Sequence, residues 1–104
     1  MNFVWDKEKS EINLQKHHVS FDLAARVFLD ENRVEIYDEK HSVDEDRYIV
    51  IGYVENVPLF VVYSMADDDG NEDCYRIISA RKALKSEVER CYTLIACQFL
   101  ELEK

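Results

Sequence analysis

The chain has 104 residues with 47% hydrophobic content, two glycines and one proline, which suits one folded domain and excludes a disordered, collagen-like or linker-rich protein. Its formal net charge of −9 is unlike the basic composition of most nucleic-acid-binding proteins, although a local basic site can coexist with it. No apolar run approaches the ~18 residues of a membrane span, and the charged N-terminus has no signal core, so we expect a cytoplasmic protein without a membrane partner.

The first 30 residues predict a short strand followed by two helices. Residues 3–6 favour an edge strand that ends at Asp6, a side chain able to cap a helix. The helix that follows, over residues 7–17, is mostly polar, and we expect Ile12 to be its buried residue. Ser20 is a second N-cap candidate. The next helix has an apolar stripe at i, i+3, i+4 and i+7 made of Phe21, Ala24, Ala25 and Phe28.

The middle of the chain predicts four strands rich in Val, Ile, Tyr and Phe. A polar loop over 39–46 and a turn over 56–58 separate the first three strands, and the acidic segment 67–73 precedes the fourth. Such short connections favour an antiparallel meander. The predicted strands cover residues 33–38, 47–55, 59–66 and 75–80.

The last segment predicts a long helix, because its apolar residues form one seam. Ser86 and Glu89 have the spacing of a capping box, which would start this helix after Leu84. The expected fold is therefore α+β, a small antiparallel sheet of about four main strands packed by two N-terminal helices and one long C-terminal helix. The seam consists of Leu84, Val88, Cys91, Tyr92, Ile95, Phe99 and Leu102.

A metal site is not expected from this sequence. His17 and His18 are adjacent and cannot share one helix face, and residues 67–70 lack the alternating ligands of a calcium loop. The three cysteines include no C-x-x-C pair, so reduced thiols are expected rather than a disulfide set or a zinc site. We expect no cofactor.

The remaining candidates are cations, imidazoles and tyrosines on or beside the strands. If the strands that carry them are neighbours, these groups can line one concave face suited to RNA cleavage without a metal ion. Guanidinium groups match phosphate oxygens, an imidazole can move a proton, and a tyrosine can stack on a base. The candidates are His41, Arg47, Tyr48, Arg76, Arg81 and Lys82.

Each candidate also has a structural explanation. Arg76 can pair with the acidic segment 67–73, and Arg81 and Lys82 can neutralise the start of the next segment. His17 lies at the end of a predicted helix, where the helix dipole favours positive charge. The residue chemistry alone therefore favours a globular α+β domain over a nuclease.

A resemblance to a known family changes this balance. The pattern "FVWD…KHHVSF", followed by "HSVDEDR", "VVYS" and "RIISARKA", resembles the BrnT family of type II toxin–antitoxin toxins over about residues 3–92. The resemblance implies a single domain over 1–104 with a RelE-like fold, whose C-terminal helix extends beyond the family core after about residue 92. It also implies a ribonuclease that inhibits translation.

The same resemblance implies the partners and the site. The partners are an RNA substrate and a BrnA-type ribbon-helix-helix antitoxin, through which the complex would contact operator DNA; a homodimer is a further possibility. Catalytic roles are expected for His41, Arg47, Arg76, Arg81 and Lys82. RNA contacts are expected for Tyr48, Lys16 and His17.

The sequence departs from the family pattern at one strand. Where the family often has "VVYTER", this chain has "VVYSMAD", so Met65 and Ala66 replace a Glu and an Arg. The alternative function is therefore a catalytically weak module that binds the antitoxin and acts as a co-repressor.

Overall fold

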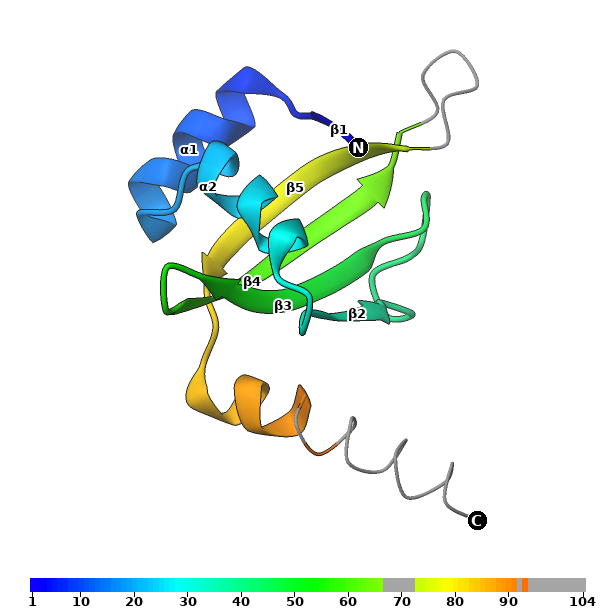
Figure 1. The fold of residues 1–104 in the computed structure, drawn as a ribbon. Helices are drawn as coiled ribbons and strands as arrows, with labels where there is room; N and C mark the ends of the chain where they lie inside the picture. The colour runs from blue at the N-terminus through cyan, green and yellow to red at the C-terminus, as the bar shows by residue number, and fades with distance from the viewer. Residues whose placement is uncertain (67–72, 92, 94–104) are drawn as a thin grey trace.

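The structure is a computed structural model that describes residues 1–66, 73–91 and 93 (Figure 1). Its strands are β1 (Asn2–Val4), β2 (Val34–Tyr37), β3 (Tyr48–Val54), β4 (Val57–Met65) and β5 (Cys74–Lys82). Its helices are α1 (Lys7–His17), α2 (Phe21–Ala25) and the 3₁₀ helix η1 (Arg26–Leu29), and residues 85–91 form a further helical segment. We call this segment the C-terminal helix. The predicted α+β class is confirmed.

The five strands form one mixed sheet in the order β1-β5-β4-β3-β2. β2, β3, β4 and β5 are antiparallel neighbours, as predicted, but β1 runs parallel to β5. The expectation of a purely antiparallel sheet is thus corrected. The sequence at the N-terminus predicts a strand. It does not predict the direction of that strand relative to β5, which depends on the path of the helices and strands between the two. Figure 1 shows β1 beside β5 at the N-terminus.

Helix α1 has the predicted bounds but buries a different residue. Asp6 caps it by accepting a hydrogen bond from the Lys9 N–H at 3.0 Å. Ile12 is 53% exposed, so the expectation that it is buried was wrong. The buried residue is Asn13, whose amide donates to the carbonyls of Val19 and Ala80 and accepts from the Ala80 N–H. The amide can occupy the interface between the helix and the sheet because its three hydrogen bonds offset the cost of desolvation.

Helices α2 and η1 cover one face of the sheet. Ser20 caps α2 through the Leu23 N–H at 3.1 Å, and the predicted apolar stripe buries Phe21 and Phe28 in the main core. Gly52 of β3 lets η1 approach closely, because a Cβ built there would lie 2.9 Å from Val27 Cγ2. The buried core contains Val19, Phe21, Ala24, Val27, Phe28, Val50, Val54, Leu59, Val61, Tyr63, Ile77 and Ala80.

The β3–β4 hairpin turns earlier than predicted. Its loop is Glu55 and Asn56, both with positive φ, and β4 already begins at Val57. Two such residues match the twist of the flanking strands. Between β4 and β5, the pairing register shifts after Val62, where β5 contains one extra residue. This bulge changes which side chains of β5 share a face.

The C-terminal helix packs on the second face of the sheet. The expected capping box of Ser86 and Glu89 is replaced by Glu87, whose Oε1 accepts the Leu84 N–H at 2.7 Å while the Glu87 N–H donates to the Leu84 carbonyl. Val88 and Cys91 line a hollow together with side chains of β2 and β3. The seam residues Tyr92, Ile95, Phe99 and Leu102 lie outside the described residues.

Candidate active site at the loop end of the sheet

The two faces of the sheet differ in chemistry near the end where β3 begins. Side chains alternate between faces along a strand. Tyr48, Tyr63 and Tyr75 point toward α2 and η1, since Phe28 contacts the rings of both Tyr63 and Tyr75. The residues next to these tyrosines, Arg47, Ser64 and Arg76, therefore belong to the opposite face.

Arg47, Ser64 and Arg76 form one row across β3, β4 and β5. Tyr48 pairs with Tyr63 in the β3–β4 register, so Arg47 lies opposite Ser64, and Ser64 pairs directly with Arg76. Ser64 is 1% exposed, and its Oγ has no hydrogen-bond partner among the described residues. A buried hydroxyl without a partner costs free energy unless something else satisfies it. The position of β4 that pairs with Arg76 therefore carries a buried hydroxyl that no described residue satisfies.

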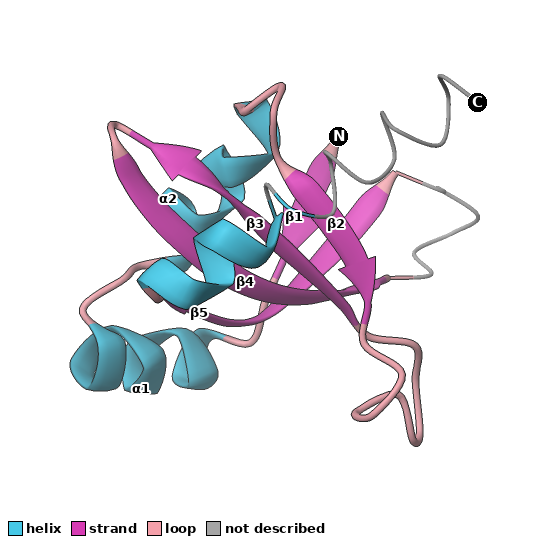
Figure 2. Cartoon of the chain, turned by 90° about the horizontal axis from the view of Figure 1, so that it is seen from below, coloured by secondary structure: helices cyan, strands magenta, loops and turns pink. Residues whose placement is uncertain are grey.

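The loop between β2 and β3 brings a carboxylate to this row. Glu45 Oε2 lies 3.4 Å from Arg76 Nη1, and Glu45 Oε1 lies 4.0 Å from Arg47 Nε. Figure 2 shows this loop extending beyond the strand ends. The partner of Arg76 is thus found in this loop, and segment 67–73, the partner considered from the sequence, lies almost wholly outside the described residues.

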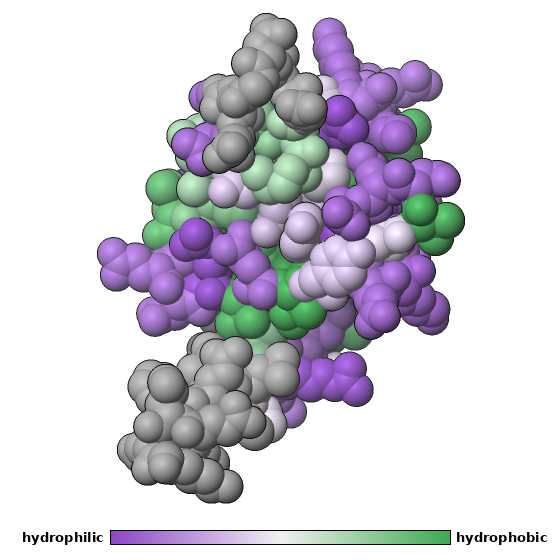
Figure 3. All heavy atoms as spheres, turned by 90° about the vertical axis from the view of Figure 1, so that its right-hand side faces the viewer, coloured by the Kyte–Doolittle hydropathy of each residue, from purple (hydrophilic) through white to green (hydrophobic). Residues whose placement is uncertain are grey.

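His41 belongs to the same corner of the molecule. It lines a hollow of about 500 Å³ together with Glu45 and Arg47. Its Nδ1 lies 2.9 Å from Asp38 Oδ2, and its side chain is 61% exposed. We call His41, Glu45, Arg47, Ser64 and Arg76 the loop-end site. Figure 3 faces this end and shows strongly hydrophilic side chains on both sides of a paler, partly apolar band.

Tyr48 is not brought together with the arginines. Its ring stacks on Tyr63 at a centroid distance of 5.5 Å and meets the edge of Tyr37, all on the face that carries α2. Burial, and a hydrogen bond from the Tyr63 hydroxyl to Glu35 at 2.7 Å, raise the pKa of Tyr63 well above its usual value. The tyrosines therefore form a structural row of rings beneath the helices.

A second group of cations lies at the other end of β5. Lys16, His17 and His18 from the end of α1 line a shallow hollow with Arg81 and Lys82. We call these five residues the helix-end patch. His18 ends α1 in a left-handed conformation and donates its N–H to the Leu14 carbonyl, which gives it a capping role.

Arg81 is held by contacts within the protein. Its guanidinium makes two hydrogen bonds of 2.8 Å to Glu87 and lies 4.0 Å from the centroid of the Phe60 ring. The Glu87 carboxylate raises the pKa of Arg81. Arg81 thereby ties β5 and β4 to the first turn of the C-terminal helix.

The sequence-predicted set is consequently divided in two. The bulge in β5 leaves Arg76 and Arg81 on the same face, but five residues of strand, roughly 16 Å, separate them. β3 and β5 are not neighbours, because β4 lies between them. Sequence reasoning missed Ser64 and Glu45. Ser64 had a signal as a polar residue in an apolar strand, whereas nothing distinguishes Glu45 from the acidic residues around it.

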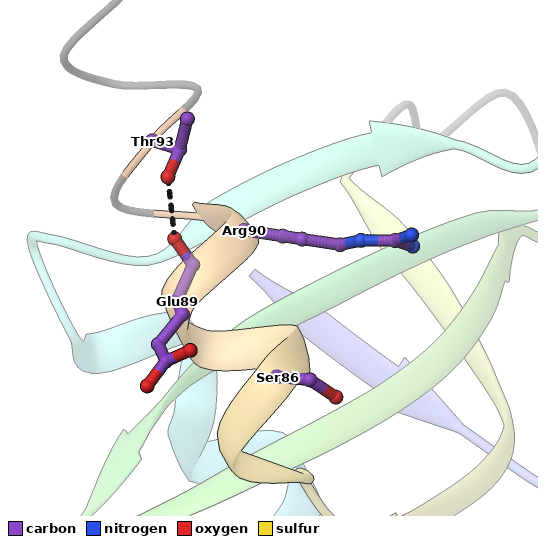
Figure 4. A pocket seen from close by; sticks show the side chains of 4 residues that line it. All are labelled: Ser86, Glu89, Arg90 and Thr93. Atoms are coloured by element: carbon purple, nitrogen blue, oxygen red, sulfur yellow. Dashed lines mark hydrogen bonds between the residues drawn. The ribbon is translucent and has the colours of Figure 1, made fainter.

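Other features of the described residues offer less chemistry. No group of three His, Cys, Asp or Glu side chains in this part of the chain could hold a metal ion. Burial raises the pKa of the Cys91 thiol, which disfavours a reactive thiolate. A hollow on the C-terminal helix is lined by Ser86, Glu89, Arg90 and Thr93, and Figure 4 shows Arg90 extended away from the other three.

Comparison with known proteins identifies the family of this chain. A family model described as "Ribonuclease toxin, BrnT, of type II toxin-antitoxin system" matches residues 5–87. The match includes every residue of the loop-end site and of the helix-end patch. No curated protein matches the chain. None of the helices within the described ranges has the length and apolar character required to cross a bilayer.

Proposed function

The chain belongs to the BrnT family of ribonuclease toxins of type II toxin–antitoxin systems, and from that premise we propose that it cleaves RNA at the loop-end site without a metal ion. The observation that carries the proposal is the convergence of Arg47 and Arg76, whose guanidinium nitrogens lie 4.0 and 3.4 Å from the carboxylate of one residue, Glu45. A phosphate would supply acceptors for both guanidinium groups.

The two arginines and His41 each have a task in this reaction. Negative charge grows on the phosphoryl oxygens when a 2′-hydroxyl attacks phosphorus, and Arg47 and Arg76 would stabilise that charge. His41, exposed and oriented by Asp38, would carry a proton.

The helix-end patch would hold a neighbouring part of the RNA. Lys16 and His17 at the end of α1 and Lys82 at the end of β5 offer positive charge around one hollow. Phosphate contacts of this kind supply affinity and fix the position of a strand without reading its sequence. Arg81 would support this patch through its contacts with Glu87 and Phe60.

The partners follow from the family. A type II toxin has an antitoxin, and we propose a BrnA-type ribbon-helix-helix protein that would connect this chain to operator DNA. The net charge of −9 favours a partner segment that is basic. Cellular RNA as the substrate is consistent with action in the cytoplasm.

A second function has one observation in its favour. Met65 and Ala66 follow Ser64 at the end of β4, at the positions where the BrnT pattern that this sequence resembles has a glutamate and an arginine. With those charges missing, the chain would retain antitoxin binding and co-repression and cleave RNA poorly.

The test is the replacement of Arg76 beside a matched control. Arg26 has the same 49% side-chain exposure as Arg76 and also pairs with one carboxylate, that of Glu55, yet it contacts neither candidate site. We expect Arg76→Ala to lower RNA cleavage by about 10²–10³-fold and to relieve growth arrest, whereas Arg26→Ala should do neither. Cleavage should also continue in EDTA.

The outcomes separate the two functions. Equal cleavage by Arg76→Ala and the wild type would remove the loop-end site from catalysis. A folded wild-type protein that binds its antitoxin and cuts no RNA would instead support the co-repressor function.

A further inference from the structure

Glu45 is a carboxylate that the loop-end site holds close to both arginines without a tight bond to either. From this arrangement we infer that Glu45 is the general base that removes the proton from the attacking 2′-hydroxyl of RNA. The inference rests on the proposed ribonuclease function and adds a catalytic residue to it.

The geometry of Glu45 suits a group that moves aside for a ligand. Its contacts with Arg76 and Arg47 measure 3.4 and 4.0 Å, whereas Glu87 binds Arg81 through two bonds of 2.8 Å in the same chain. Its side chain is 39% exposed. Contacts this long between exposed groups contribute little free energy. A phosphate can therefore take over the two guanidinium groups while the carboxylate stays next to it.

The loop that carries Glu45 is fixed at both ends. The Asp38 N–H donates to the Arg47 carbonyl at 2.8 Å, and the Ser42 hydroxyl accepts the Arg47 N–H at 2.9 Å. The Tyr37 hydroxyl donates to Asp46 Oδ1 at 2.9 Å, on the residue after Glu45. These bonds fix the backbone of the loop. The contacts of Glu45 with Arg47 and Arg76 therefore depend on the conformation of its side chain alone.

A proton donor faces the same hollow. His41 lines the hollow with Glu45, and its Nδ1 is engaged by Asp38, which leaves Nε2 to act on the substrate. A carboxylate base and an imidazolium acid on two sides of one phosphate form a complete metal-free set. The other charged groups around Glu45 are Lys40, Asp44, Arg47 and Arg76.

The 2′-hydroxyl proton passes to a Glu45 carboxylate oxygen as O2′ forms a bond to phosphorus. The bond between phosphorus and O5′ breaks, and O5′ takes the proton from His41 Nε2. The products are a 2′,3′-cyclic phosphate end and a 5′-hydroxyl end, with Glu45 protonated and His41 neutral, and exchange with water restores both.

A competing role for Glu45 predicts the opposite change in cleavage when the carboxylate is removed. If the carboxylate serves as a resident anion that blocks the arginines, then its removal would strengthen RNA binding and raise cleavage. The base role requires that removal lower cleavage while binding stays equal or becomes tighter. Binding and cleavage must therefore be measured separately.

The experiment uses the purified full chain with Glu45→Gln, Glu45→Asp and the control Glu39→Gln. Glu39 is an exposed carboxylate in the same loop that does not line the hollow. Single-turnover cleavage of a single-stranded RNA is followed across pH, and binding is measured with the same sequence as 2′-O-methyl RNA, which lacks the attacking hydroxyl. Circular dichroism checks that each variant is folded.

We expect Glu45→Gln to lower cleavage by about 10²–10⁴-fold and to lose the acidic limb of the pH–rate profile, with binding of 2′-O-methyl RNA maintained. Glu45→Asp should recover part of the rate, and Glu39→Gln should match the wild type. A Glu45→Gln variant that cleaves as fast as the wild type, or faster, overturns the base role and leaves the ribonuclease function intact. A wild-type protein that binds the RNA analogue but cuts no RNA overturns both.

Discussion

The ion pair between Arg81 and Glu87 offers a test of whether Arg81 supports the fold or acts on RNA. The pair has two bonds of 2.8 Å, and the side chains are 34% and 19% exposed. The Glu87 carboxylate also accepts the Leu84 N–H, and the Arg81 guanidinium lies over the Phe60 ring. Replacing each residue by alanine, singly and together, measures how strongly the two depend on each other.

The magnitude follows from these contacts. A bidentate, charge-assisted pair at this exposure should contribute about 1–2 kcal/mol, and the cation–π contact of Arg81 about 0.5–1 kcal/mol. We expect Arg81→Ala to lower the free energy of unfolding by roughly 2–3 kcal/mol and Glu87→Ala by roughly 2 kcal/mol. The double variant should lose about 3 kcal/mol, less than the sum, because the shared pair is lost once.

The pair should also depend on pH. The Arg81 guanidinium, followed by the Leu84 N–H, holds the pKa of Glu87 below its usual range. A carboxyl group whose folded pKa is lowered stabilises the protein fully above its unfolded pKa, about 4.3 for Glu. That contribution is lost as the pH falls through the lower folded value. The coupling energy should therefore be fully present at pH 7 and should decrease as the pH falls below the unfolded pKa, about 4.3, in urea titrations at each pH.

One result would refute a structural role for Arg81. If Arg81→Ala and Glu87→Ala both kept the wild-type stability, while Arg81→Ala alone lost RNA cleavage, then Arg81 would act on the substrate. Parallel losses of stability in the two single variants would instead account for any loss of activity through the C-terminal helix.

Three further predictions concern the core and the RNA path. Gly52→Ala should lower the melting temperature through a loss of about 1–3 kcal/mol, because its Cβ would meet Val27; an unchanged melting temperature would mean that η1 shifts freely. Asn13→Ala should cost roughly 2–4 kcal/mol in urea unfolding, since three hydrogen bonds are lost, and a cost below about 1 kcal/mol would contradict this accounting. Lys16→Gln with Lys82→Gln should reduce the salt slope of RNA binding by about 1.4, and an unchanged slope would place the helix-end patch outside the RNA path.

The sequence was most informative where the deciding interactions are local. The bounds of α1 and the caps at Asp6 and Ser20 depend on neighbours within one or two turns, and each was confirmed. The stripe predicted for one helix continues from α2 into η1, with Phe28 in η1 and Ala25 only partly buried. The burial of Asn13 was not foreseen, because its partners include Ala80, 67 residues away. The parallel pairing of β1 escaped prediction for the same reason.

The candidate site shows the same division between local and distant information. Arg47 and Arg76 were identified as cations next to strands, but their common row depends on Ser64 in the strand between them. Glu45 enters the site through a loop whose path cannot be read from its acidic sequence. What the sequence lacked was the cross-strand register, which decides the neighbours of each side chain.

Contact geometry separates the arginines of this acidic chain into different roles. Arg81 and Arg76 lie at the two ends of β5, and each faces a glutamate, but the contacts measure 2.8 Å at one end and 3.4 Å at the other. The tight pair has two hydrogen bonds, and its Glu87 also accepts the Leu84 N–H at the start of the C-terminal helix, so this pair stabilises the fold. The loose pair of Arg76 and Glu45 lies next to Ser64, whose buried hydroxyl has no partner among the described residues. A phosphate would replace the Glu45 carboxylate on Arg76 at little cost in free energy. An acidic protein can in this way keep a site for a polyanion, since a carboxylate that binds its arginines weakly leaves them available to RNA.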